Sequence, residues 1–178
     1  MATSLNGWTA IRLRVDPRLR TITIPGTKRK ITCARYAHVV FASFLADWNR
    51  LMPARLKLDT GPVDSWIYRE ARLATGLSNH SSGTAVDVRY DVLKPDNQRH
   101  MTDAERGILK AILARYVTDD GHHILANGAF WKSCDEMHTE LSQAWDTANG
   151  AKRNTTRADV LNVIQRLGID SKGNRVAR

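Results

Sequence analysis

The sequence has few cysteines and no long hydrophobic run. Only Cys33 and Cys134 are present among its 178 residues, too few for a disulfide framework and without a CxxC spacing, so we expect two buried free thiols. No run approaches the roughly 18 apolar residues of a membrane-spanning helix. Residues 1–16 lack the apolar segment of a secretory signal peptide, so we expect synthesis and folding in the cytosol.

Acidic residues are also in the minority. The chain has 27 Lys and Arg against 18 Asp and Glu, a net charge of +9, while 42% hydrophobic and 25% charged residues are ordinary values for a globular protein. Such a charge attracts polyanions: nucleic acid, anionic lipid or the anionic polymers of a bacterial wall. The length fits one domain, or one domain and a tail.

Three helices are predicted from periodicity and caps. Apolar residues recur every three or four positions over 34–52, before Pro53. Thr102 and Glu105 form a capping box for a helix that extends to Tyr116, and a third helix, 157–167, ends at Gly168. Alternating patterns predict short strands at 11–15, 22–24, 56–59, 65–68, 84–90 and 137–141, with a loop from residue 124 to the last of these. The composition changes after Asn149, so we divide the chain into a domain of residues 1–149 and a basic segment of residues 150–178 with a disordered end from Ser171.

The segment SNHSSGTAVD, residues 78–87, contains the first candidate metal ligands. His80 lies in a glycine-containing loop, and Asp87 lies on the strand that follows, between apolar neighbours. Burial of a bare carboxylate is costly unless a metal ion or a hydrogen-bond donor compensates it. Taken alone, the segment is also compatible with a capped turn and a partly exposed Asp87.

A second histidine segment, DEMHTE at residues 135–140, places His138 among carboxylates. Two histidines and one carboxylate are a common catalytic zinc set, in which water takes the fourth position. The ion activates that water, and a nearby carboxylate accepts its proton. Together the two segments contain all the parts of a zinc hydrolase, although their spacing alone is only moderately specific.

The pair SNHSSGTAVD and DEMHTE, in this order, resembles the zinc peptidase family of D-Ala-D-Ala carboxypeptidases and L-alanyl-D-glutamate endopeptidases, the VanY-like peptidase domains. The similarity is greatest to peptidase domains of bacteriophage endolysins and covers residues 66–141. It implies an α+β fold of the DD-peptidase/hedgehog-like type: a small antiparallel sheet bearing a zinc site, with helices packed around it. It also implies that His80, Asp87 and His138 bind Zn²⁺.

The resemblance also implies a general base and a substrate-binding arginine. The base lies three residues before the last histidine, at Asp135. Strand alternation leaves Glu136 as a rival, since it should share a face with His138, and makes Glu140 a neighbour of the ligands.

In the family, the arginine follows a tyrosine upstream of the first histidine. Tyr68-Arg69 matches this element, with Arg72 as the alternative. His122 and His123 are weaker metal candidates, because adjacent strand residues point to opposite faces. Trp131 either lines a substrate groove or packs against the sheet.

The function implied by the resemblance is hydrolysis of an amide bond in the stem peptides of bacterial peptidoglycan, with L-Ala–D-Glu favoured, for host cell lysis. We expect a monomer that is made in the host cytoplasm, reaches the wall on release and is retained there by anionic wall polymers, without a specific nucleic-acid partner. Two alternatives remain: a wall-binding zinc module without turnover, and a basic nucleic-acid-binding protein.

Overall fold

Two small antiparallel sheets and three α-helices make up the part of the chain that the computed structural model describes, residues 1–72 and 74–176. The predicted α+β class is therefore confirmed. The first sheet pairs β1 (Leu19–Thr23) with β2 (Lys30–Ala34). The second has the order β3-β4-β6-β5 and consists of β3 (Val63–Asp64), β4 (Ala85–Val88), β6 (Asp135–Leu141) and β5 (Leu125–Gly128).

The helices are α1 (His38–Leu51), α2 (Asp103–Leu113) and α3 (Arg157–Leu167). Both halves of the predicted capping box are formed at α2, because the Thr102 hydroxyl accepts from the Glu105 amide and the Glu105 carboxylate accepts from the Thr102 amide. Gly168 ends α3 in the left-handed conformation, with φ 59°. None of the described helices is long and apolar enough to cross a membrane.

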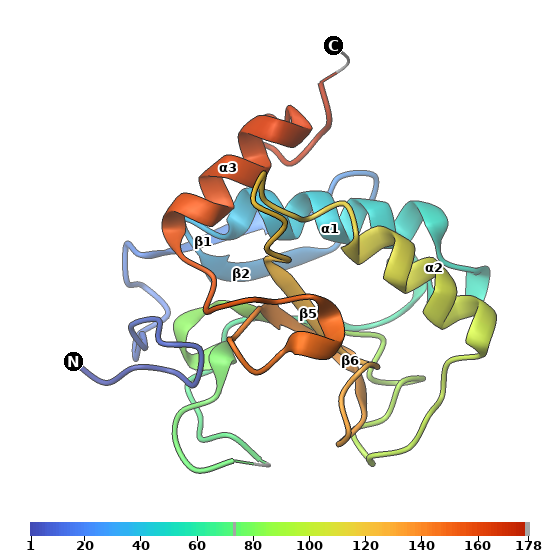
Figure 1. Ribbon diagram of the computed structural model, residues 1–178, viewed down its shortest axis with the longest axis horizontal. Helices are drawn as coiled ribbons and strands as arrows, with labels where there is room; N and C mark the ends of the chain where they lie inside the picture. The colour runs from blue at the N-terminus through green and yellow to red at the C-terminus, as the bar shows by residue number, and fades with distance from the viewer. Residues whose placement is uncertain (73, 177–178) are drawn as a thin grey trace.

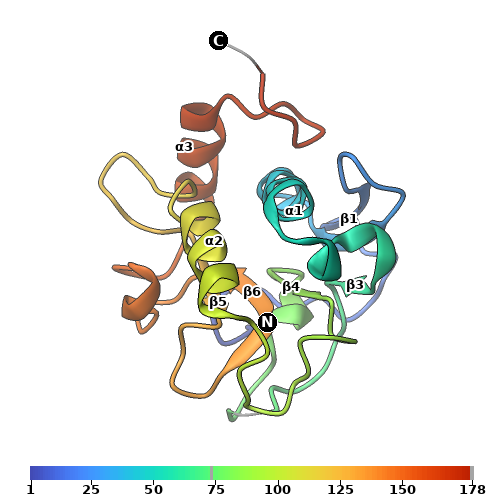
Figure 2. The same cartoon turned by 90° about the vertical axis from the view of Figure 1, so that its right-hand side faces the viewer.

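The hydrophobic core lies between the helices and the second sheet (Figures 1 and 2). Phe44 and Trp48 of α1 and Tyr116 after α2 are fully buried and make edge-to-face contacts. Val160 and Val163 of α3 belong to the same cluster, so the core contains residues from both sides of Asn149.

The two cysteines are free and buried, as expected. Near both ends of the described chain, residues contact the rest of the molecule, as Ser4 does with Ser82 and Arg175 with Asp47. The expected disordered end includes Ser171–Val176, but here the Gly168 carbonyl accepts from the Val176 amide and Arg175 forms an ion pair with Asp47. Residues 177–178 lie outside the described residues.

Several strand predictions were wrong. Residues 11–15 form no strand, and the first hairpin begins instead at Leu19. Residues 54–60 form two 3-10 turns in place of the strand predicted at 56–59, and the short β3 precedes the segment 65–68. The predicted loop from residue 124 contains β5, which completes the second sheet.

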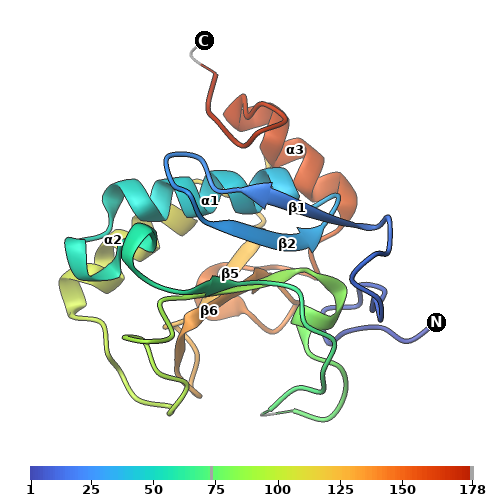
Figure 3. The ribbon, with the colours of Figure 1, turned by 180° about the vertical axis from the view of Figure 1, so that it is seen from behind.

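Loops gather on the side of the molecule opposite α1 and α3 (Figures 1 and 3). They are the loop between β3 and β4, the loop before α2 and the loop between β5 and β6. Because β4 and β6 are neighbours in the sheet, these loops surround the two strands that bear Asp87 and His138.

Candidate metal centre

Asp87, His138 and His80 converge on one point. Asp87 and His138 are directly opposite each other in the β4–β6 pair, and His80 lies on η3 (Asn79–Ser82), the short turn that leads into β4. Asp87 Oδ1 lies 2.9 Å from His138 Nδ1 and 3.1 Å from His80 Nε2. The two imidazole nitrogens are 3.1 Å apart. The three predicted ligands thus form a buried group that could hold a metal ion, and no other such group occurs among the described residues.

The hydrogen bonds behind the histidines determine which nitrogens face this point. His80 Nδ1 lies 2.5 Å from the Ser65 carbonyl oxygen, and His138 Nε2 lies 2.9 Å from Glu140 Oε2. Both partners only accept, so these ring nitrogens carry the protons of the neutral imidazoles. The unprotonated nitrogens then face Asp87, which places three acceptors together without a donor.

A cation at the centre of these three acceptor atoms would compensate for the missing hydrogen-bond donor. Burial alone would raise the pKa of Asp87. The electrostatic interactions and hydrogen bonds with His80 and His138 have a larger, opposite effect, so the pKa is lowered and the carboxylate is charged. Burial lowers the pKa of His138, but its hydrogen bonds to Asp87 and Glu140 raise it well above 6.5. The cluster therefore favours positive charge at its centre, in the form of a proton on His138 or a metal ion.

The donor set and its spacing fit zinc. With bonds of about 2.0–2.1 Å in a tetrahedral site, ligand atoms lie roughly 3.3–3.4 Å apart. The observed separations of 2.9–3.1 Å are close to this value without any rearrangement of the strands. His80, Asp87 and His138 could thus hold a metal ion, and the separations of their ligand atoms are compatible with zinc.

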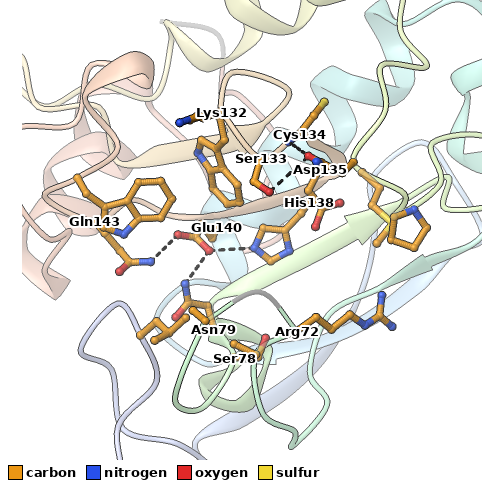
Figure 4. A pocket seen from close by; sticks show the side chains of 18 of the residues that line it. Arg72, Ser78, Asn79, Lys132, Ser133, Cys134, Asp135, His138, Glu140 and Gln143 are labelled. Atoms are coloured by element: carbon orange, nitrogen blue, oxygen red, sulfur yellow. Dashed lines mark hydrogen bonds and ion pairs between the residues drawn. The ribbon is translucent and has the colours of Figure 1, made fainter.

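Glu140 anchors His138 within a buried polar network (Figure 4). Its carboxylate accepts from Asn79 Nδ2 at 2.6 Å and from Gln143 Nε2 at 2.8 Å, besides its contact with His138. Asn79 is in turn fixed by Asn6, whose backbone amide donates to Asn79 Oδ1 at 2.8 Å. The N-terminal segment is thereby connected to the candidate metal centre through the Asn79 side chain, which accepts from the Asn6 backbone and donates to Glu140.

A cavity of about 540 Å³ opens beside His138. Asp135, Arg69 and Trp131 line it, and none of the three is a ligand candidate. Further lining residues come from the surrounding loops, among them Arg72, Asn97, Lys132, Gln143 and Trp145. The cavity therefore gives access from the solvent to the candidate metal ligand His138.

Asp135 faces this cavity because β6 is irregular. Asn127 of β5 pairs with Thr139 of β6, but the next residue of β5, Gly128, pairs with Asp135. The segment of β6 between Asp135 and Thr139 therefore forms a bulge. Oδ1 of Asp135 is buried and has no hydrogen-bond partner among the described residues. Burial raises the pKa of this carboxyl group, although His138 opposes the shift. A desolvated carboxylate beside a metal centre is suited to proton transfer.

Glu136 points elsewhere, contrary to simple strand alternation. Its carboxylate accepts from the backbone amides of His100 and Met101, each at 2.6 Å, and lies 3.4 Å from Arg106 Nη1. It is fully buried and does not line the cavity. These contacts give Glu136 a role in fixing the loop before α2, and of the two carboxylates only that of Asp135 lines the cavity.

Arg69 and Arg72 both line the cavity. Burial and Arg72 lower the pKa of Arg69, while Asp87 and Asp135 oppose this shift, so the guanidinium lies within electrostatic reach of both carboxylates. Tyr68 is not a cavity residue, and its hydroxyl accepts from Arg12 Nε at 3.3 Å. Of the Tyr68-Arg69 pair, the arginine alone reaches the candidate site.

The other histidines belong to no metal-binding group among the described residues. His122 is fully buried, with Nε2 3.1 Å from Thr155 Oγ1, and His123 shares no metal group with it among the residues described. His100 Nε2 lies 2.8 Å from Asp96 Oδ1, and His38 contacts the Arg35 carbonyl. Trp131, by contrast, lines the cavity, with its ring centroid 5.6 Å from that of His138.

Asn79, Gln143, Trp145 and the Ser65 carbonyl were not singled out from the sequence. The position of Asn79 next to His80 in the motif could have identified it as a site residue. The contact from Ser65 is made by its backbone carbonyl, so no residue type in the sequence indicates it.

No family model, curated protein or solved structure matches this chain. The assignment of function consequently depends on the geometry of the site and on the motifs.

Proposed function

We propose that this chain is a zinc-dependent peptidoglycan peptidase of the phage endolysin type with a DD-peptidase/hedgehog-like fold, acting on the wall stem peptide at L-Ala–D-Glu. The observation that carries the proposal is the convergence of three ligand atoms, from His80, Asp87 and His138, beside a cavity lined by Asp135, whose buried Oδ1 has no hydrogen-bond partner among the described residues. The order of the two histidine motifs supports the same class. The net charge of +9 suits an enzyme that is retained on anionic wall polymers after its release from the host cytoplasm.

In the proposed reaction His80, Asp87 and His138 would hold a zinc ion. When bound, the ion supplies Lewis acidity, which polarises the scissile carbonyl group and makes water a nucleophile near neutral pH. Asp135 accepts a proton from the attacking water and transfers it to the leaving nitrogen as the C–N bond breaks. Arg69 donates hydrogen bonds to the oxygen on which negative charge develops.

The first test measures new amino groups in purified peptidoglycan treated with the protein. We expect their release, its loss with a chelator and its recovery when zinc is added back. A preparation that binds no zinc would favour a basic nucleic-acid-binding protein. Zinc binding without turnover would favour a wall-binding module. Mass spectrometry of the soluble fragments then identifies the cleaved bond.

The second test concerns the base. Asp135→Asn should reduce kcat about 10²–10⁴-fold because the proton acceptor is lost, with the zinc content unchanged. Glu136→Gln is the matched control, since it changes the neighbouring carboxylate that faces away from the cavity. Loss of activity in Glu136→Gln with full activity in Asp135→Asn would reverse the assignment.

A further inference from the structure

Two tryptophans line the same cavity beside the candidate metal centre. Trp131 lies next to His138, and the ring of Trp145 lies 5.1 Å from that of Trp131 at an angle of 58°. Trp145 is 55% exposed, among the most exposed large apolar side chains of the described chain outside its termini. Aromatic surface thus extends from His138 to the solvent.

The backbone fixes Trp145 in this exposed position. The amide of Gln143 donates to Asp146 Oδ2 at 2.8 Å, and the amide of Ala144 donates to Asn154 Oδ1 at 2.9 Å. The Gln143 side chain also donates to Glu140, so the loop is tied to the network behind His138. A large apolar ring that the fold orders in water marks a surface for a ligand.

We infer that Trp131 and Trp145 form a subsite for the N-acetylmuramoyl ring to which the stem peptide is attached. This inference rests on the proposed function and extends it to the glycan part of the substrate. A pyranose ring has an apolar C–H face that packs on aromatic rings and a polar rim that needs hydrogen bonds. Gln143 and Lys132 line the same cavity and offer polar groups to that rim.

The length of the substrate agrees with this assignment. One alanine and one lactyl group separate the L-Ala carbonyl from the sugar, which is about 7 Å at the usual rise per residue. The ring centroid of Trp131 lies 5.6 Å from that of His138, and the ring centroid of Trp145 lies 5.1 Å from that of Trp131. The distance from His138 to the two tryptophans is therefore comparable with the distance from the L-Ala carbonyl to the sugar. The D-Ala–D-Ala bond lies about 10 Å farther from the sugar. A sugar on the two tryptophans therefore selects L-Ala–D-Glu.

The test compares one peptide in two forms, free and attached to N-acetylmuramic acid. We expect the intact enzyme to prefer the attached form in kcat/KM by about tenfold, and we expect Trp145→Ala to bring the ratio of the two kcat/KM values to about one. Leu161→Ala is the control, since it truncates a similarly exposed apolar side chain on α3. Equal rates on both forms in the intact enzyme, or a preference that survives in Trp145→Ala, would overturn the subsite.

A binding measurement separates this inference from the proposed function. The zinc-loaded protein is titrated with a peptide-free N-acetylmuramic acid disaccharide while tryptophan fluorescence is recorded. A saturable change that is lost in Trp145→Ala supports the subsite even if no hydrolysis occurs, in which case the proposed function alone fails. No change, with hydrolysis intact, refutes the subsite alone, and no change without hydrolysis refutes both.

Discussion

The protonation of single imidazole nitrogens determines what the candidate centre can bind. His80 and His138 each turn a lone pair toward Asp87 because an acceptor lies behind the opposite ring nitrogen. For His80 this acceptor is a neutral carbonyl group, whereas for His138 it is the carboxylate of Glu140. A carboxylate behind a ligand histidine makes the imidazole more basic and fixes its orientation.

At the residue scale, we predict that Glu140→Gln lowers the affinity for zinc about 10–100-fold, because His138 loses its charged partner. Competition with a chromophoric chelator measures this affinity. Glu70→Gln, a change of an exposed residue, should leave it unchanged. If the zinc affinities of both variants equal that of the unchanged protein, Glu140 does not support the ligand.

Among the elements, the turn from η3 into β4 requires a glycine at position 83. Gly83 has φ +68°, and a Cβ atom there would lie 2.5 Å from the backbone nitrogen of Ala34 in β2. This nitrogen donates to the Gly83 carbonyl at 2.8 Å, so the turn and the first sheet are in direct contact. The same turn brings His80 within reach of Asp87.

At the element scale, we predict that Gly83→Ala destabilises the fold. The left-handed conformation costs about 1–2 kcal/mol for a residue with a side chain, and the contact with Ala34 adds to this. The melting temperature should fall by at least about 4 °C. Gly107→Ala, within α2 and in open space, should instead raise it by about 2 °C, because alanine favours the helix. Equal melting temperatures for the two variants would contradict the prediction.

On the scale of the whole molecule, Asp47 joins three parts of the chain. This buried carboxylate on α1 lies 2.9 Å from Arg50, 3.1 Å from Arg115 after α2 and 2.9 Å from Arg175 near the C-terminus. Burial raises the pKa of Asp47, but the three arginines outweigh it, so the pKa is lowered. The ionised form therefore stabilises the folded state.

We predict that Asp47→Asn lowers the free energy of unfolding at pH 7 by about 2 kcal/mol. Because the folded-state pKa is lowered, the stabilisation is present above the unfolded-state value of about 3.9 and is lost as the pH falls through the folded-state value. Denaturant titrations at neutral and acidic pH measure the difference from the unchanged protein, which should shrink in acid. The exposed Asp64→Asn should show little effect, and a difference independent of pH would contradict this account.

Features of the fold that depend on interactions between residues close in sequence could be predicted from the sequence. The capping box of α2 and the glycine that ends α3 depend on contacts within a few residues, so their positions were predicted correctly. These caps need no knowledge of distant parts of the chain. The convergence of His80, Asp87 and His138 was expected from the two histidine motifs together with the family resemblance that they carry, and the structure brings the three residues together.

Contacts between distant segments decided the rest. Strand β5 and the bulge in β6 exist only through their mutual pairing, and that bulge turns Asp135 toward the cavity and leaves Glu136 with the loop before α2. The hydrophobic periodicity of the sequence likewise does not predict the contact of the Ser65 carbonyl with His80 or the Asn6–Asn79–Glu140 network. Residue types and spacing thus specify which groups can take part in the chemistry. Their orientation arises only when strands far apart in sequence pair and exclude water, because backbone hydrogen bonds then set the direction of each side chain.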